Sequence, residues 1–235
     1  MGIERFKGES APNAEMKCLC VLVLDVSGSM EPCMDELNEA LRNFFKDIQY
    51  SRGLPESTKD QLEICIYAFD EEVMLKRNPC LLKQGEIPPK LAQRESITES
   101  VAALKAAIQM VEDRKEFYKD TGQPYYRPWI VFMTDGEPYP YRENEIAAIE
   151  SQIKDDVQKR KYQILGLGVG TKISEGTLKR LTNNNACKLK GTNFGAFFEW
   201  LSNSMSIIVS SQPGQKIDIS PGCEKWMSKF DEYEV

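Results

Sequence analysis

The residues best suited to chemistry in this chain follow its most apolar stretch. Asp25, Ser27 and Ser29 stand at alternate positions directly after the apolar run 19–24. A carboxylate and two hydroxyls are hard oxygen donors of the kind that hold Mg²⁺ or Mn²⁺. In open α/β sheets, ligands bind at the carboxyl ends of the strands. This spacing therefore predicts a divalent-metal site on the loop that leaves a buried strand.

Further oxygen donors stand near two other predicted elements. Asp135 follows the apolar run 129–133, and Ser96 and Thr98 precede a predicted helix. In a doubly wound sheet, loops of this kind converge on the crevice where the strand order reverses. Three hydroxyls and two carboxylates around one point make an octahedral oxygen shell once waters are added. The predicted metal ligands are Asp25, Ser27, Ser29, Thr98 and Asp135.

The hydroxyl groups decide what such an ion could do. Because hydroxyls are neutral, an ion held directly by them keeps its Lewis acidity, while the two aspartates act through water. The ion then has an open position that favours an anionic oxygen. A carboxylate from another protein would complete the shell, which predicts a metal-dependent protein contact.

Simpler explanations of the same residues remain open. Asp25, Ser27 and Ser29 are residue types that favour helix caps and turns, and Thr98 could cap only its own helix. Metal binding is favoured over capping because a second donor-bearing strand end, at Asp135, accompanies the first.

Three other motifs have alternative explanations. The spacing Gly166-x-Gly168-x-Gly170 is not that of a phosphate loop, and close packing of a strand on a helix explains it better. The segment 138–141 holds two tyrosines that could form a recognition rim beside the metal or a tight turn. The charged run 112–116 is expected to be a solvated helix end.

The composition excludes several catalytic classes. The 235-residue chain has no histidine, and therefore no Ser-His-Asp triad, no Cys-His dyad and no His-ligated zinc. Its net charge of −6 argues against nucleic acid or a membrane surface as a main partner. Seven cysteines without a C-x-x-C motif indicate reduced thiols in a cytoplasmic protein, and no apolar run approaches membrane-spanning length.

Apolar runs alternate with segments of helical periodicity, which predicts a doubly wound, Rossmann-like α/β fold. Its sheet is expected to be mostly parallel, with one antiparallel edge strand. Buried strands are expected at 17–25, 62–69, 129–133 and 162–169, with short edge strands at 73–75 and 187–189. Helices are expected at 34–48, 97–111, 146–157, 174–181 and 194–208, and a loop over the top of the sheet at 76–97.

The pattern indicates one domain with short flanking segments. An irregular lead-in is expected over 1–16, the domain over 17–212 and a tail over 213–235. Trp226 and Phe230 in the tail are expected to pack on the domain, whereas its acidic end at 231–234 is expected to be solvated.

The combination of D-x-S-x-S after one apolar strand and T-D-G after another resembles the metal-ion-dependent adhesion site (MIDAS) of the von Willebrand factor A (vWA) family. The resemblance implies a vWA fold. It also implies that Ser27, Ser29 and Thr98 bind the ion directly and that Asp25 and Asp135 support it. By this resemblance the chain is a non-enzymatic module whose Mg²⁺ or Mn²⁺ bridges to an Asp or Glu of a partner protein.

Several further segments are similar to the bacterial TerY/YegL-like subgroup of tellurium-resistance and stress operons. They are Glu112–Lys115, Tyr125–Ile130, Thr134–Pro138, Lys188–Gly191 and Phe198–Ser202. This likeness implies a cytoplasmic partner, with a serine/threonine kinase or phosphatase as the candidates. The subgroup usually has Gly-Gly-Thr-Pro-Met-Gly around the threonine, whereas this chain has Ser-Ile-Thr-Glu-Ser-Val over 96–101.

Two alternative functions belong to other classes. Asp25 could be the nucleophile or a metal ligand of a Mg²⁺-dependent phosphotransfer enzyme, as in aspartate-based phosphatases. Such enzymes usually have a second aspartate two residues on, where this chain has Ser27. The other alternative is a structural scaffold that binds no metal.

Overall fold

The computed structural model describes residues 5–94, 97–212 and 215–228. Its strands are β1 (Cys18–Asp25), β2 (Leu62–Phe69), β3 (Val73–Leu81), β4 (Trp129–Thr134), β5 (Gln163–Gly168), β6 (Ala186–Leu189) and β7 (Met227–Ser228). Its α-helices are α2 (Met34–Gln49), α3 (Thr58–Gln61), α4 (Ser100–Asp120), α5 (Glu143–Gln158), α6 (Glu175–Leu181) and α7 (Phe194–Ser210). Two 3₁₀ helices, η1 (Gly28–Cys33) and η2 (Cys223–Lys225), complete the described elements.

These strands form one sheet with the order β3-β2-β1-β4-β5-β6-β7. Neighbours from β2 to β6 run parallel, and β3 and β7 pair antiparallel at the two edges. The prediction of a doubly wound, mostly parallel sheet with an antiparallel edge is confirmed. The strand order reverses between β1 and β4, because the chain passes from β1 to β2 on one side and from β4 to β5 on the other. Ligand sites of such sheets lie at this reversal.

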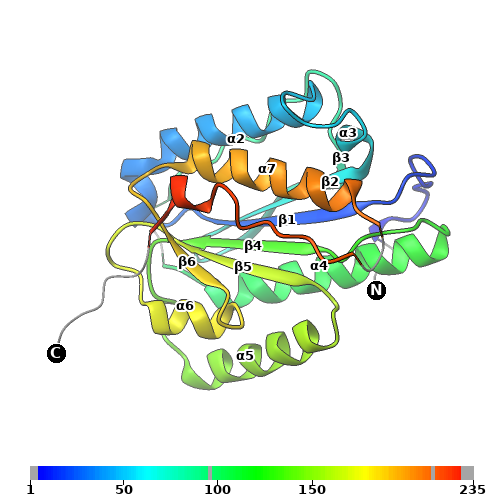
Figure 1. Ribbon diagram of the computed structural model, residues 1–235. Coiled ribbons are helices and arrows are strands. Elements are labelled where there is room, and N and C mark those ends of the chain that lie inside the picture. Colours follow the sequence, from blue (N-terminus) through cyan, green and yellow to red (C-terminus); the bar gives the residue numbers. More distant parts are fainter. Residues whose placement is uncertain (1–4, 95–96, 213–214, 229–235) are drawn as a thin grey trace.

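Helices cover both faces of the sheet, with α2 and α7 on one side and α4, α5 and α6 on the other (Figure 1). Alternate side chains of β1 point to the two faces, as the pleat of a strand requires. Leu22 and Leu24 pack on the α2 and α7 side, whereas Val21 and Val23 pack on the α4 and α5 side. Burial on both faces explains why the sequence of β1 is continuously apolar.

The segment after β2 departs from the predicted loop. The antiparallel strand β3 continues to Leu81, so residues 76–81 belong to the sheet and not to a loop over its top. The chain then returns along α2. There the backbone N–H of Gly85 donates to the side chain of Gln49 (2.8 Å), and that of Leu91 donates to the side chain of Asn38 (2.8 Å). Only the last part of the predicted loop therefore reaches the carboxyl ends of the strands.

The charged run 112–116 was predicted to be a solvated helix end, but part of it is buried. Arg114 is 2% exposed and forms two hydrogen bonds of 2.8 Å with the fully buried carboxylate of Glu63 in β2. The hydroxyl of Tyr118 donates to the same carboxylate (2.7 Å). The guanidinium also lies over the Phe117 ring, 4.1 Å from its centroid. A buried arginine with a bidentate carboxylate partner satisfies its charge inside the fold.

The close packing predicted for the glycines of the fourth strand is confirmed at Gly166. A Cβ at Gly166 would lie 2.7 Å from the side chain of Thr182, so this glycine allows a strand to pack closely on α6 and the turn after it. Cys18, Cys20 and Cys65 are buried free thiols that fill space in the sheet, and the other four cysteines are free as well.

The segment after α7 packs back on the domain as far as it is described. Trp226 is buried, with its ring centroid 5.0 Å from that of Phe197 and 4.9 Å from that of Trp200. It precedes β7, which forms a second antiparallel edge that the sequence pattern did not indicate. Phe230 and the acidic end lie outside the described residues.

Candidate metal site

Four of the five predicted ligands lie together where the strand order reverses. The loop after β1 carries Ser27 and Ser29, whose hydroxyl oxygens are 3.3 Å apart. The hydroxyl of Ser29 donates to a carboxylate oxygen of Asp135, which follows β4 (2.8 Å). Asp25 ends β1, directly beside β4 in the sheet. The fold therefore brings together residues that are more than 100 positions apart in the sequence.

Asp25 is held at the base of this group. Its carboxylate is fully buried and accepts hydrogen bonds from the backbone N–H of Ser27 (2.9 Å) and the hydroxyl of Thr134 (2.7 Å). Burial raises the pKa of Asp25 to about 6, and the hydrogen bonds from Ser27 and Thr134 oppose that rise. A nearby cation would stabilise the ionised carboxylate and lower this pKa again.

Asp135 stands closer to the surface. Burial raises the pKa of its carboxyl, while the Ser29 hydroxyl and the charge of Lys172 act in the opposite direction. A surface pocket of about 380 Å³ lies beside Ser29 and Asp135 and extends to the segment Val169–Lys172 between β5 and α6. Two of the predicted donors, Ser29 and Asp135, are therefore accessible from this pocket.

Backbone hydrogen bonds hold Thr98 in position. Its N–H donates to the carbonyl of Tyr139 (3.2 Å), and the N–H of Tyr139 donates back to the carbonyl of Thr98 (2.9 Å). This pairing ties the threonine to the loop that follows Asp135. Within the described residues, the Thr98 hydroxyl makes no hydrogen bond to the other four predicted ligands. Ser96, the other hydroxyl considered, lies outside the described residues.

The segment 138–141 pairs with Thr98 through its backbone and exposes its two tyrosines. The backbone of Tyr139 forms an isolated bridge with that of Thr98, and Tyr139 is 63% exposed. The ring of Tyr141 is 51% exposed, and its hydroxyl donates to Glu143 (3.0 Å). The tight turn and the recognition rim offered for this segment stay predictions, and its exposed tyrosines are what a rim would need.

Asp70, which the sequence analysis did not assign to the site, supports it from the end of β2. Its carboxylate is fully buried, accepts the backbone N–H of Glu72 (2.8 Å) and lies 3.3 Å from the guanidinium of Arg94. Its carbonyl accepts the N–H of Glu99, next to Thr98 (2.8 Å). Its place directly after a buried strand, like that of Asp25, was the available signal.

The donors present suit a hard divalent cation. Within the described ranges, no group of three or more His, Cys, Asp or Glu side chains could hold a metal. In that part of the chain, a metal site at the strand-order reversal would need hydroxyl donors beside its carboxylates. Hydroxyls with two carboxylates behind them match the oxygen preference of Mg²⁺ and Mn²⁺. The residues fit the ion that the sequence predicted.

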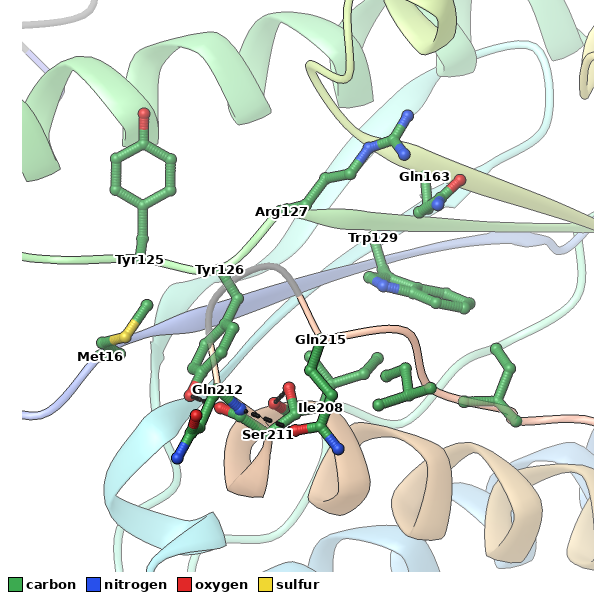
Figure 2. A pocket seen from close by; sticks show the side chains of 12 residues that line it. Met16, Tyr125, Tyr126, Arg127, Trp129, Gln163, Ile208, Ser211, Gln212 and Gln215 are labelled. Atoms are coloured by element: carbon green, nitrogen blue, oxygen red, sulfur yellow. Dashed lines mark hydrogen bonds between the residues drawn. The ribbon is translucent and has the colours of Figure 1, made fainter.

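A pocket of about 420 Å³ at the other end of the sheet has a different character (Figure 2). Met16 precedes β1 and Trp129 begins β4, so the pocket lies at the amino ends of the strands. Its wall includes Ile208 of α7, and the hydroxyl of Tyr126 donates to the carbonyl of Val209 (3.0 Å). Trp129 is buried, as predicted for core packing. This end of the sheet holds none of the predicted metal ligands.

A doubly wound sheet with oxygen donors at its strand-order reversal defines a class of α/β domain that binds ligands at the carboxyl ends of its strands. The family model of the von Willebrand factor type A domain matches residues 20–137, about half of the chain. The chain belongs to this family. The matched segment contains all five predicted ligands.

Solved structures support the fold. A von Willebrand factor type A protein from Catenulispora acidiphila aligns with a TM-score of 0.60 and 12% identity over 81% of this chain and 43% of its own. The D319A mutant of the PilB minor pilin from Streptococcus sanguinis aligns with a TM-score of 0.60 and 14% identity over 86% of this chain and 65% of its own. BatB from Bacteroides thetaiotaomicron aligns with a TM-score of 0.53 and 16% identity over 83% of this chain and 100% of its own. This chain thus spans less than two thirds of the first two structures.

No curated protein sequence matches this chain significantly. Among the described residues, no helix has both the length and the apolar character that crossing a membrane requires.

Proposed function

We propose that this protein is a non-enzymatic binding module whose Mg²⁺ or Mn²⁺ ion bridges to a carboxylate of a partner protein. Ser27, Ser29 and Thr98 would bind the ion, and Asp25 and Asp135 would support it. Domains of the von Willebrand factor type A family commonly mediate metal-dependent protein interactions. The finer assignment, to a TerY/YegL-like stress system with a cytoplasmic kinase or phosphatase partner, rests on the sequence resemblance.

The observation that carries the proposal is the contact between the hydroxyl of Ser29 and the carboxylate of Asp135 (2.8 Å). It joins the loops after two adjacent strands at the reversal of strand order, with Ser27 and Asp25 alongside. Such an arrangement gathers neutral and anionic oxygens at a place open to a partner, as a bridging ion requires. Two structurally similar proteins, the PilB minor pilin and the SpaC pilus adhesin from Lactobacillus rhamnosus GG, carry domains of the same fold.

The burial of Asp25 argues against the phosphotransfer alternative. A nucleophilic carboxylate must reach the phosphorus atom of its substrate. The carboxylate of Asp25 is fully buried, and both of its oxygens already accept hydrogen bonds from Ser27 and Thr134. This geometry suits a supporting group beneath an ion better than an attacking group.

Metal-induced stabilisation tests the proposal. An ion that binds only the folded chain stabilises it, by about 2.7 kcal/mol when the free ion is at one hundred times its dissociation constant. We expect Mg²⁺ or Mn²⁺ to raise the melting temperature of the wild-type protein and Ser27→Ala to abolish that increase. Calorimetry of both proteins, with and without chelator, measures it.

Ser57→Ala is the matched control. Ser57 is exposed, at the start of α3, and its hydroxyl does not cap that helix. This variant should keep the full metal response. Equal metal responses in the wild-type and Ser27→Ala proteins would show that the ion binds elsewhere or not at all. Capture of partner proteins with and without chelator would then separate a metal-free scaffold from a metal-dependent one.

A further inference from the structure

Two side chains of opposite charge line the pocket beside the proposed metal site. Lys172 follows β5, and Glu31 lies in η1; both line the pocket of about 380 Å³ that Ser29 and Asp135 border. Both side chains are exposed, and within the described residues neither forms a hydrogen bond or an ion pair. The pocket therefore offers one cation and one anion without an ion-pair partner in the described residues, and the charge of Lys172 also acts on Asp135.

Other cations near the site are already neutralised. Arg94 lies 3.3 Å from the carboxylate of Asp70, and Arg142 lies 3.2 Å from that of Glu99. Lys172 differs from both because it lines the pocket and forms no ion pair with a carboxylate in the described residues. An unpaired lysine beside a metal open to one carboxylate favours a second carboxylate at a short distance from the first.

We infer that the partner presents two neighbouring acidic residues, one to complete the shell of the ion and one to pair with Lys172. This inference rests on the proposed function and specifies the chemistry of the partner. The chain carries a net charge of −6, so an acidic segment is repelled by most of the surface and needs a local cation for orientation. Glu31 repels the second carboxylate from its side of the pocket, which adds selectivity through repulsion.

Three capped peptides measure this preference. The first, Gly-Asp-Glu-Gly, has two carboxylates; the second, Gly-Asp-Gln-Gly, has nearly the same shape but only one; the third, Gly-Asn-Gln-Gly, has none. Binding is followed by NMR titration of the full chain in excess Mg²⁺ and again in chelator. An exposed ion pair changes affinity by roughly 1.4-fold to fivefold, so we expect the two-carboxylate peptide to bind more tightly by that factor at low ionic strength. Added salt should reduce the difference.

Two variants with opposite effects identify the residues. Lys172→Glu should remove or invert the preference for the Glu peptide over the Gln peptide, each measured against the same variant in excess Mg²⁺. Glu31→Gln should increase the preference. Both side chains are exposed, so neither variant is expected to change the fold.

The outcomes separate the inference from the proposed function. If the Gln peptide binds only with Mg²⁺ but the Glu peptide binds no better, or if Lys172→Glu leaves the preference unchanged, the second-carboxylate inference is wrong and the metal bridge stands. If neither acidic peptide shows Mg²⁺-dependent binding, the proposed function fails and the inference fails with it.

Discussion

Asp25 should destabilise the metal-free fold at neutral pH. Its pKa is raised from 3.8 to about 6, chiefly because burial removes water from the carboxylate. Each unit of pKa corresponds to about 1.36 kcal/mol, so keeping this group ionised in the folded chain costs about 3 kcal/mol at pH 7. Because the folded chain binds the proton more tightly than the unfolded chain, this contribution lowers stability as pH rises from about 4 to about 6. Below pH 4 the cost is small.

Asp25→Asn tests this reasoning, since an amide carries no charge. In chelator at pH 7, the variant should be more stable than the wild-type protein by roughly 1–3 kcal/mol, because rearranging the hydrogen bond from Thr134 offsets about 1 kcal/mol of the gain. A change of 1 kcal/mol shifts the melting temperature of a chain of this size by about 2–4 °C. The advantage should shrink towards zero at pH 4. In excess Mg²⁺ only the wild-type protein should gain stability.

Urea unfolding at pH 4, 5, 6 and 7 in chelator provides the measurement, and Glu39→Gln, which removes an exposed carboxylate on α2, provides the control. The control should follow the wild-type pH dependence. If the Asp25→Asn and wild-type stabilities differ by the same amount at every pH, the carboxylate is not the group that titrates. If the variant is less stable at pH 7 without metal, the hydrogen bonds outweigh the cost of burial and the argument is refuted.

Two further predictions concern the fold. Glu63→Gln should lower the free energy of unfolding by about 3–5 kcal/mol, because it removes the buried carboxylate that pairs with the buried guanidinium of Arg114. Glu9→Gln, which removes a 46%-exposed partner of the same arginine, should cost at most about 1 kcal/mol; equal losses in urea unfolding would contradict this ranking. Gly166→Ala should cost about 1–3 kcal/mol by calorimetry, since its Cβ would lie 2.7 Å from Thr182; an unchanged melting temperature would show that the turn after α6 yields freely.

The strands that position the site could be predicted because their sequences carry a strong signal. The strands β1 and β2 are mostly apolar runs, and the structure places them at 18–25 and 62–69, within one residue of the prediction. The edge strand β3 was predicted too short because its second half contains Lys76, Asn78 and Pro79, which favour loops. An edge strand tolerates such residues since one side of it pairs with no other strand.

The buried ion pair could not be predicted from local pattern. Glu63 and Arg114 are 51 positions apart; Glu63 lies in a strand predicted to be buried, whereas Arg114 lies in a charged run of the kind that is ordinarily solvated. Only the packing of α4 on β2 brings them together. The run 112–116 was misinterpreted for this reason, since composition shows charges but not which of them have partners inside the fold.

The backbone of Thr98 is held without the glycines that are common around this threonine in the subgroup that the chain resembles. Main-chain hydrogen bonds hold the segment at three points: Arg94 to Val26 (3.0 Å), Thr98 to Tyr139 and Glu99 to Asp70. These bonds tie it to the loops after β1, β4 and β2. Because peptide groups form all three, the side-chain types at these positions gave no indication of them. A loop fixed in this way places its threonine through the surrounding frame, so non-glycine neighbours are compatible with a ligand role for Thr98.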